Sequence, residues 1–229
     1  MPRLLIRDAD WVVTMDGDRR IIRDGALAID GDRIAAVGKT ADVARGFTAD
    51  TTLHADGKLV LPGLVDTHVH NTQQLGRGLA DECDIPVQLL ERLYGYEKEM
   101  TPEDAYWAAL LCQLELIKAG TTCFIDPSSY YPGETARAVA TSGLRGIVAR
   151  TAFDIHETPI GSLPDTMFRE TTDEAVAKAR EVVIEYDDPS AGHHQCADQA
   201  LSSERSQREP PAWRHGQESK HEQRPSYRI

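Results

Sequence analysis

Two histidines two positions apart, His68 and His70, are the residues of this sequence best suited to hold a metal ion. They follow an apolar run that predicts a buried strand over residues 64–67. Residues i and i+2 of a strand point to the same side, so both imidazoles can reach one cation. Imidazole is a ligand for zinc, iron, copper and nickel. Asp66 lies two residues earlier on the same face, where its carboxylate can orient a metal-bound histidine.

An isolated His-x-His is more often two histidines near a turn, because short motifs match by chance. Whether this pair is a metal site therefore depends on the elements predicted around it. Residues 1–60 predict a small β module, since short apolar runs alternate there with Asp and Gly. The pair Asp30-Gly31 stands between two such runs and predicts a hairpin.

Residues 61–190 predict strands that alternate with helices. The expected strands cover residues 64–67, 121–126 and 144–154, and the expected helices cover residues 86–93, 102–119, 133–142 and 173–186. Thr101 and Pro102 are typical of a helix start, and Gly120 of a helix end. This alternation indicates about three βα units of a parallel sheet, too few for an eight-stranded barrel, which needs roughly 200 residues or more.

Residues 191–229 differ sharply in composition from the rest of the chain. They contain almost no aliphatic side chains beyond alanine and are rich in Gln, Ser, Arg, His and Glu. A segment with so little apolar area cannot offset its ordering entropy, so we expect a disordered tail. The abrupt change suggests the hypothesis that this tail is out-of-frame sequence.

The overall composition favours small-molecule chemistry. The 229 residues are 41% hydrophobic and 27% charged, as in ordinary globular proteins, and the formal net charge is −12. That charge argues against a nucleic-acid partner, because phosphate binding needs clustered Lys and Arg. The four cysteines form no CxxC pair, and no apolar run is long enough for a membrane span. We therefore expect a cytoplasmic protein with no membrane partner.

The segment Pro-Gly-Leu-Val-Asp-Thr-His-Val-His at residues 62–70 resembles the amidohydrolase superfamily of metal-dependent hydrolases. The similarity extends over residues 25–34, over Arg-Gly-Leu-Ala-Asp at 77–81 and over Glu-Leu-Ile-Lys-Ala-Gly-Thr-Thr at 115–122. It implies an α/β fold: the N-terminal part of a TIM-barrel amidohydrolase, with about three βα units, preceded by a small β-sandwich module. The implied cofactor is a divalent metal, Zn or Fe.

Within the superfamily, the sequence looks most like the methylthioadenosine/S-adenosylhomocysteine deaminases, with triazine chlorohydrolases and guanine deaminases nearby. That resemblance implies hydrolytic deamination of an aminated heterocycle or nucleoside, in which the metal lowers the pKa of water to about 7. It also implies that Glu97 contacts the ribose hydroxyls of the substrate. A solvated charge before a helix is an equally good interpretation of Glu97.

The remaining catalytic residues of the family, two histidines, a Glu and an Asp, follow later barrel strands that we do not find before Asp188. His193, His194, His215 and His221 lie where no strand is predicted, and a disordered tail cannot supply the fixed geometry of a metal ligand. We interpret His156 as a loop histidine and Lys178 as a surface charge. The expectation is a truncated, inactive copy with no identifiable catalytic residue.

Two alternatives stay open. The chain is a non-catalytic binding or interaction fragment, or a second chain completes its barrel. The open edge of a parallel sheet also predicts homo-oligomers or aggregation.

Overall fold

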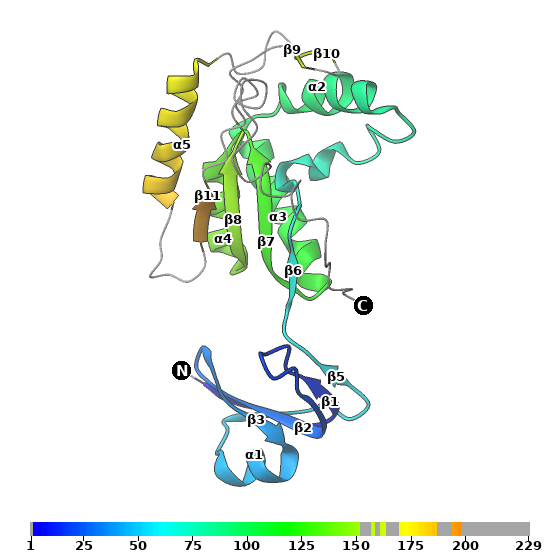
Figure 1. Cartoon of the computed structure of the whole chain (residues 1–229), viewed down its shortest axis with the longest axis vertical. Coiled ribbons are helices and arrows are strands. Elements are labelled where there is room, and N and C mark those ends of the chain that lie inside the picture. The colour runs from blue at the N-terminus through cyan, green and yellow to red at the C-terminus, as the bar shows by residue number, and fades with distance from the viewer. Residues whose placement is uncertain (1, 152–156, 159–160, 164–169, 187–193, 198–229) are drawn as a thin grey trace, which may run out of the picture. The chain divides into compact units, whose positions relative to one another are not determined.

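The computed structural model describes residues 2–151, 157–158, 161–163, 170–186 and 194–197. The chain divides into two compact units, Met1–Gly63 and Leu64–Ile229. Each unit has its own sheet and its own hydrophobic core (Figure 1). We call them unit 1 and unit 2.

Unit 1 is a five-stranded sheet with one helix against it. Its elements are β1 (Arg3–Val13), β2 (Ile21–Asp30), β3 (Arg33–Lys39), α1 (Thr40–Gly46), β4 (Thr51–His54) and β5 (Leu59–Val60). Strands β1 to β3 are antiparallel, and β4 and β5 pair parallel to β1. The hairpin predicted at Asp30-Gly31 is confirmed between β2 and β3, and Gly31 provides the positive φ of 62° that the turn requires.

Unit 2 is built on a four-stranded parallel sheet in the order β11-β8-β7-β6. Its main elements are β6 (Leu64–Asp66), α3 (Pro102–Lys118), β7 (Thr121–Ser129), α4 (Pro132–Ser142), β8 (Arg145–Arg150), α5 (Thr172–Tyr186) and β11 (His194–Ala197). A short hairpin joins β9 (Glu157–Thr158) to β10 (Gly161–Ser162). Phe124, Val139, Leu144 and Val148 form the core between the sheet and α4. The predicted α/β alternation and parallel pairing are confirmed.

Strand β11 corrects one prediction. We expected a disordered tail from residue 191, yet His194–Ala197 pair in parallel with residues 146–149 of β8. The expectation was based on apolar content, but a four-residue edge strand is held by backbone hydrogen bonds that any non-proline sequence can make. Residues 198–229 lie outside the described part of the chain.

Helix α3 begins and ends where the sequence predicts. The Thr101 hydroxyl accepts a hydrogen bond from the Asp104 N–H at 3.2 Å, and the Asp104 carboxylate accepts one from the Thr101 N–H at 3.0 Å. This capping box, with Pro102 in the first turn, fixes the start of the helix. Gly120, with a φ of 85°, follows its last turn.

Residues 71–97 carry the chain from the histidines to α3. They form a 3₁₀ segment over Asn71–Gly76, a π-helical segment over Val87–Leu93 and α2 (Tyr94–Glu97). We predicted a helix over residues 86–93, and the structure has the wider π-helical turn there. Single π-helical turns occur often at functional sites. In the part of the chain that the structure describes, no helix is long and apolar enough to cross a membrane.

Loss of the α3 cap should destabilise the protein. Thr101→Ala leaves the Asp104 N–H without its side-chain acceptor, and we expect the free energy of unfolding to fall by about 1 kcal/mol. Urea denaturation measures this change. Thr101→Ser keeps the hydroxyl and should unfold like the wild type; equal losses in both variants would show that the hydroxyl is not what stabilises the helix.

Candidate metal centre

The candidate metal centre is formed by the segment that directly follows β6. The Val69 N–H donates to the Ile125 carbonyl at 3.0 Å, which extends the pairing with β7 beyond Asp66. Val69 packs against the core of unit 2. Thr67 and His68 form a bend after β6, and His68 and His70 lie on either side of Val69 in the chain.

The two imidazole rings lie side by side. Their centroids are 5.0 Å apart and their planes meet at 85°. The ring of His70 is half-buried, and its Nδ1 lies 3.3 Å from the Ser128 hydroxyl oxygen at the end of β7. Burial and the neighbouring His68 lower the pKa of His70. The ring is therefore neutral at neutral pH, which is the form that binds a metal ion.

Asp66 interacts with the backbone of this segment. Its Oδ1 accepts a hydrogen bond from the His68 N–H at 3.1 Å. The expected role was to orient a histidine ring, and the contact that the structure gives is to the main chain of His68. Asp66 therefore helps to fix the turn that presents the pair.

Glu97 is buried, with 6% of its surface exposed. Its Oε1 accepts a hydrogen bond from Gln73 Nε2 at 2.8 Å, and the Tyr130 hydroxyl also bonds to its carboxylate. Burial raises the pKa of Glu97 to about 7, and these hydrogen bonds only partly oppose the shift. The alternative interpretation of Glu97 as a solvated charge is wrong. Gln73 belongs to the segment after His70, so Glu97 bonds to the same loop as the histidine pair.

Lys178 lies on α5 and is half-exposed, but it is paired. Its Nζ lies 2.7 Å from Oε1 of the buried Glu170. The Glu170 carboxylate also accepts hydrogen bonds from the two terminal guanidinium nitrogens of Arg150. Burial alone would raise the pKa of Glu170, but the hydrogen bonds from Arg150 and Lys178 outweigh it and lower that pKa. Among the described residues, this network connects α5 to the end of β8 and does not include His68 or His70.

The other histidines considered from the sequence fall largely outside the described structure. His156, His193, His215 and His221 are outside the described residues, and of His194 only the backbone position in β11 is described. Among the described residues, no third His, Cys, Asp or Glu completes a group of three ligands with His68 and His70.

Three further residues around the pair were missed by the sequence analysis: Gln73, Asp126 and Ser128. Asp126 is fully buried at the end of the predicted strand 121–126, and Ser128 follows it. Polar residues at the carboxyl end of a parallel strand are typical of active sites in such folds, and that position could have identified both. Nothing in the spacing of Gln73 predicts its contact with Glu97.

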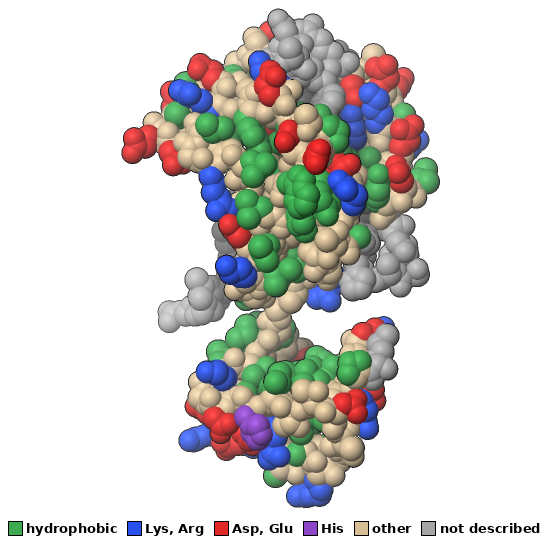
Figure 2. Space-filling view, turned by 180° about the vertical axis from the view of Figure 1, so that it is seen from behind, with side chains coloured by type: hydrophobic (Ala, Val, Ile, Leu, Met, Phe, Trp, Pro, Cys, Tyr) green, Lys and Arg blue, Asp and Glu red, His purple; other side chains and the backbone are tan. Residues whose placement is uncertain are grey.

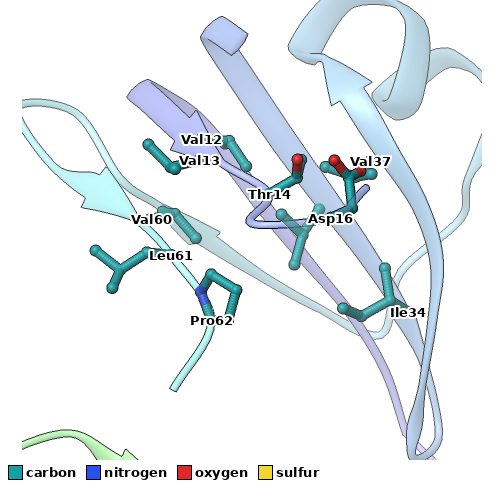
Figure 3. A pocket seen from close by; sticks show the side chains of 10 residues that line it. Val12, Val13, Thr14, Asp16, Ile34, Val37, Val60, Leu61 and Pro62 are labelled. Atoms are coloured by element: carbon teal, nitrogen blue, oxygen red, sulfur yellow. The ribbon is translucent and has the colours of Figure 1, made fainter. Parts of the chain in front are cut away.

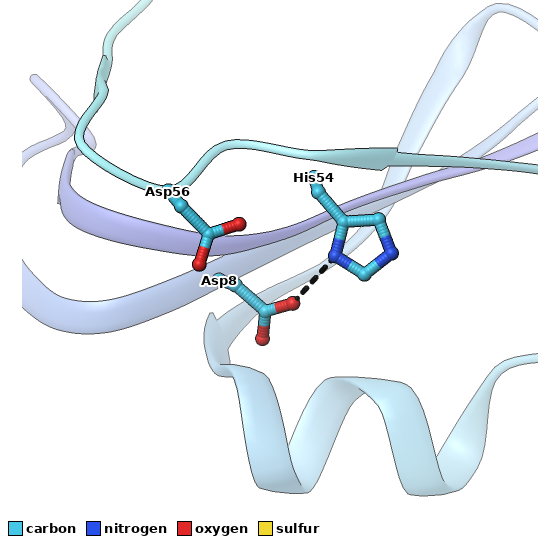
Figure 4. Close-up of side chains that lie close together, drawn as sticks. All are labelled: Asp8, His54 and Asp56. Carbon is cyan, nitrogen blue, oxygen red and sulfur yellow. Dashed lines mark hydrogen bonds and ion pairs between the residues drawn. The ribbon is translucent and has the colours of Figure 1, made fainter.

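Unit 1 has one other group of possible ligands (Figure 4). Asp8, His54 and Asp56 have ligand atoms within 4.8 Å of one another. Asp8 Oδ2 already accepts hydrogen bonds from His54 Nδ1 and Arg7 Nε, each at 2.9 Å. Since His54 and Asp56 are exposed, and exposed acidic groups of this kind are common without an ion, we assign the group no function.

Unit 1 also has an apolar hollow of about 240 Å³ (Figure 3). Its walls are mainly aliphatic side chains from β1, β2, β3, β5 and the segment after β5, and Thr14 and Asp16 also line it. Thr14 and Asp16 are its polar lining residues, so the hollow lacks a converging set of groups for chemistry.

Together, these features define a class of protein: a β unit that precedes a parallel βα unit, with a histidine pair at the carboxyl end of its first parallel strand. The chain belongs to the amidohydrolase family. Residues 59–212, more than half of the chain, match the model described as "Amidohydrolase family". Residues 25–47 also match an "Imidazolonepropionase-like composite domain, bacteria". The resemblance inferred from residues 62–70 is confirmed.

Curated relatives with similar sequences are named as deaminases. The chain is 39% identical over 158 residues to the 5-methylthioadenosine/S-adenosylhomocysteine deaminase of Desulforamulus reducens, covering 69% of this chain and 36% of the relative. It is 37% identical over 156 residues to the 5'-deoxyadenosine deaminase of Methanosarcina mazei, covering 68% and 34%. The chain thus spans about a third of the length of these relatives.

Solved structures with a similar fold hold zinc. An adenosine deaminase from Xanthomonas campestris with bound Zn matches with a TM-score of 0.71 at 28% identity, covering 85% of this chain and 42% of that one. Atrazine chlorohydrolase from Arthrobacter aurescens, complexed with zinc, matches with a TM-score of 0.73 at 25% identity, covering 86% and 47%.

The buried carboxyl of Glu97 should make stability depend on pH. With its folded pKa raised from 4.5 to about 7, the unfolded chain ionises first as the pH rises through this window. The folded wild type therefore loses stability between about pH 4.5 and 7, and a Glu97→Gln variant escapes this loss. We expect the stability of the variant relative to wild type to rise by about 2–3 kcal/mol between pH 4.5 and 8.

Urea denaturation of both proteins across this pH range measures the difference. Glu99→Gln removes an exposed carboxylate two residues away and serves as the matched control. If the free energies of unfolding of Glu97→Gln and the wild type differ by the same amount at every pH, the raised pKa of Glu97 is contradicted.

Proposed function

We propose that this chain carries the metal-binding and substrate-binding residues of a hydrolase that deaminates an aminated heterocycle or nucleoside. In that reaction water replaces the amino group on a ring carbon, and ammonia leaves. The observation that carries the proposal is the His68–His70 pair at the end of β6, with the buried Glu97 bonded to the same loop. The names of the relatives support the type of reaction.

The donor set fits zinc or iron. Two imidazoles lie on one side of the chain, and His70 has its Nδ1 engaged by Ser128, which leaves Nε2 for a cation. A bound divalent cation supplies Lewis acidity that makes hydroxide available near neutral pH. The zinc named for two structural neighbours supports the choice of metal.

Glu97 is proposed to bind the hydroxyls of a ribose. A carboxylate has about four acceptor positions, and Gln73 and Tyr130 use part of them. With a pKa of about 7, the group can accept or donate a hydrogen bond at neutral pH. The free acceptor positions and the ability to donate a hydrogen bond both suit the two adjacent hydroxyls of a ribose.

The chain by itself is proposed to be inactive. Deamination needs a group that carries a proton to the departing amine. The carboxylates nearest the histidine pair in the described residues, Asp66 and Asp126, are engaged by main-chain N–H groups. A site with two histidine ligands should also bind a metal more weakly than a site with three or four. We propose that the four parallel strands of unit 2, β6, β7, β8 and β11, are the first four strands of a TIM barrel.

Completion of the barrel by a second chain is the alternative that a specific observation favours. Among the described strands β6 pairs with β7 alone, and its Leu64 and Val65 are 51% and 58% exposed. Helix α3 also exposes Trp107, Leu114 and Ile117. Hydrophobic side chains are visible on the surface of unit 2 from one side (Figure 2). Such surfaces are commonly covered by a partner.

Zinc binding should require the histidine pair. We expect one weakly bound zinc per chain, measured by competition with a chromophoric chelator, and loss of measurable binding in His68→Asn. His54→Asn alters the histidine of unit 1 and is the matched control, which should bind zinc like the wild type. Binding that survives His68→Asn and disappears in His54→Asn would place the metal in unit 1 and refute the proposal.

The oligomeric state separates the alternatives. Size-exclusion chromatography, with a zinc assay and an ammonia-release assay on 5'-methylthioadenosine, should show a monomer that releases no ammonia. A stable dimer with stoichiometric zinc and deaminase activity would refute inactivity and support completion by a second copy. A monomer that binds no zinc at all would support a non-catalytic interaction fragment.

A further inference from the structure

A buried carboxylate near the end of β7 bonds both to the loop after His70 and to the last residues of β7 itself. Asp126 is 0% exposed. Its Oδ2 accepts a hydrogen bond from the Asn71 N–H at 3.2 Å, and its Oδ1 accepts one from the Ser128 N–H at 3.3 Å. Asn71 is the residue after His70, and Ser128 is the residue that contacts the His70 ring. The Asp126 carboxylate therefore holds the backbone of Asn71, next to His70, and the backbone of Ser128, whose hydroxyl contacts the His70 ring.

Ser128 contacts one nitrogen of the His70 ring, and its hydroxyl can either accept a hydrogen bond from that nitrogen or donate one to it. Ser128 Oγ lies 3.3 Å from His70 Nδ1. A neutral imidazole carries its hydrogen on one nitrogen and an acceptor lone pair on the other. If Nδ1 donates its hydrogen to Ser128 Oγ, Nε2 keeps its lone pair and faces away from Ser128. Partners of this kind fix the tautomer and orientation of metal-binding histidines.

The same residues are anchored deep in unit 2. Asn71 Oδ1 accepts a hydrogen bond from Gln113 Nε2 of α3 at 3.2 Å, and Gln113 Oε1 accepts one from the Ser142 hydroxyl of α4 at 2.7 Å. Asn71 and Gln113 are both 0% exposed. Because two helices and a strand hold the chain of hydrogen bonds, the loop after His70 has little freedom to move.

We propose that Ser128, held in place by Asp126, is the positioning residue that sets the tautomer and orientation of His70 so that Nε2 is the metal ligand. The inference rests on the proposed role of His70 as a ligand. It adds a specific assignment of atoms: the His70 Nδ1–H donates to Ser128 Oγ, and Nε2 is left for the cation. Neither Ser128 nor Asp126 touches the metal in this assignment.

The test uses three variants of the full chain. Ser128→Ala removes the hydroxyl, and Ser128→Thr retains it. Ser129→Ala is the matched control, because Ser129 is the next residue on the same strand, is 0% exposed and bonds to Thr135 without contacting His70. Urea denaturation checks that all three variants are folded.

The first measurement is made without metal. Long-range ¹H–¹⁵N spectra at pH 8, with the His70 signals assigned by His70→Asn, report which ring nitrogen carries the hydrogen. We expect the Nδ1–H form in the wild type, Ser128→Thr and Ser129→Ala. Ser128→Ala should show a mixture of both forms.

The second measurement is zinc affinity by chelator competition. We expect Ser128→Ala to bind about 10–100-fold more weakly, the range typical for partners of metal-bound histidines, with Ser128→Thr restoring most of the loss. Ser129→Ala should stay within about two-fold of the wild type. An unchanged tautomer in Ser128→Ala, or an equal loss of affinity in Ser129→Ala, would overturn the proposal. If the tautomer changes in Ser128→Ala but the wild-type protein binds no zinc, the positioning role of Ser128 is supported and the proposed metal function is refuted.

Discussion

The hydrogen bond from the Val69 N–H to the Ile125 carbonyl is the contact on which the candidate site depends. It extends a three-residue strand into the segment that carries the histidines, and Val69 packs on the core beside Phe124 and Val148. His68 and His70 are the two neighbours of Val69, and their rings lie 5.0 Å apart. The burial of this one valine therefore helps to fix the backbone between the two candidate ligands.

Around this segment the protein buries charge-bearing groups that water would otherwise stabilise. Burial raises the pKa of Glu97 and of Asp126 to about 7 in each case. Each carboxyl has hydrogen-bond donors from the loops that follow β6 and β7, which limits the desolvation cost. Two such groups near one loop destabilise the fold at neutral pH. Carboxyl groups with perturbed pKa values cluster at functional sites. We therefore interpret Glu97 and Asp126 as part of the candidate site.

The sequence predicted the features that depend on local pattern. The His68–His70 spacing, the capped start of α3 and the turn after Asp30 each follow from a few adjacent residues, and the structure has the same helix start and hairpin. The burial of Glu97 could not be predicted, because it results from packing against Gln73 and Tyr130, which are distant in the sequence. Strand β11 was missed for a related reason: its pairing partner is β8, and its own composition carries no strand pattern.

The central claim is that His68 and His70 hold a divalent metal through their imidazoles. X-ray absorption at the zinc edge, recorded on the zinc-loaded chain, tests this most directly. We expect nitrogen and oxygen ligands at about 2.0–2.1 Å with the scattering pattern of two imidazoles, and loss of that pattern in the His68→Asn/His70→Asn double variant. Sulfur ligands at about 2.3 Å, or an imidazole pattern that survives in the double variant, would contradict it.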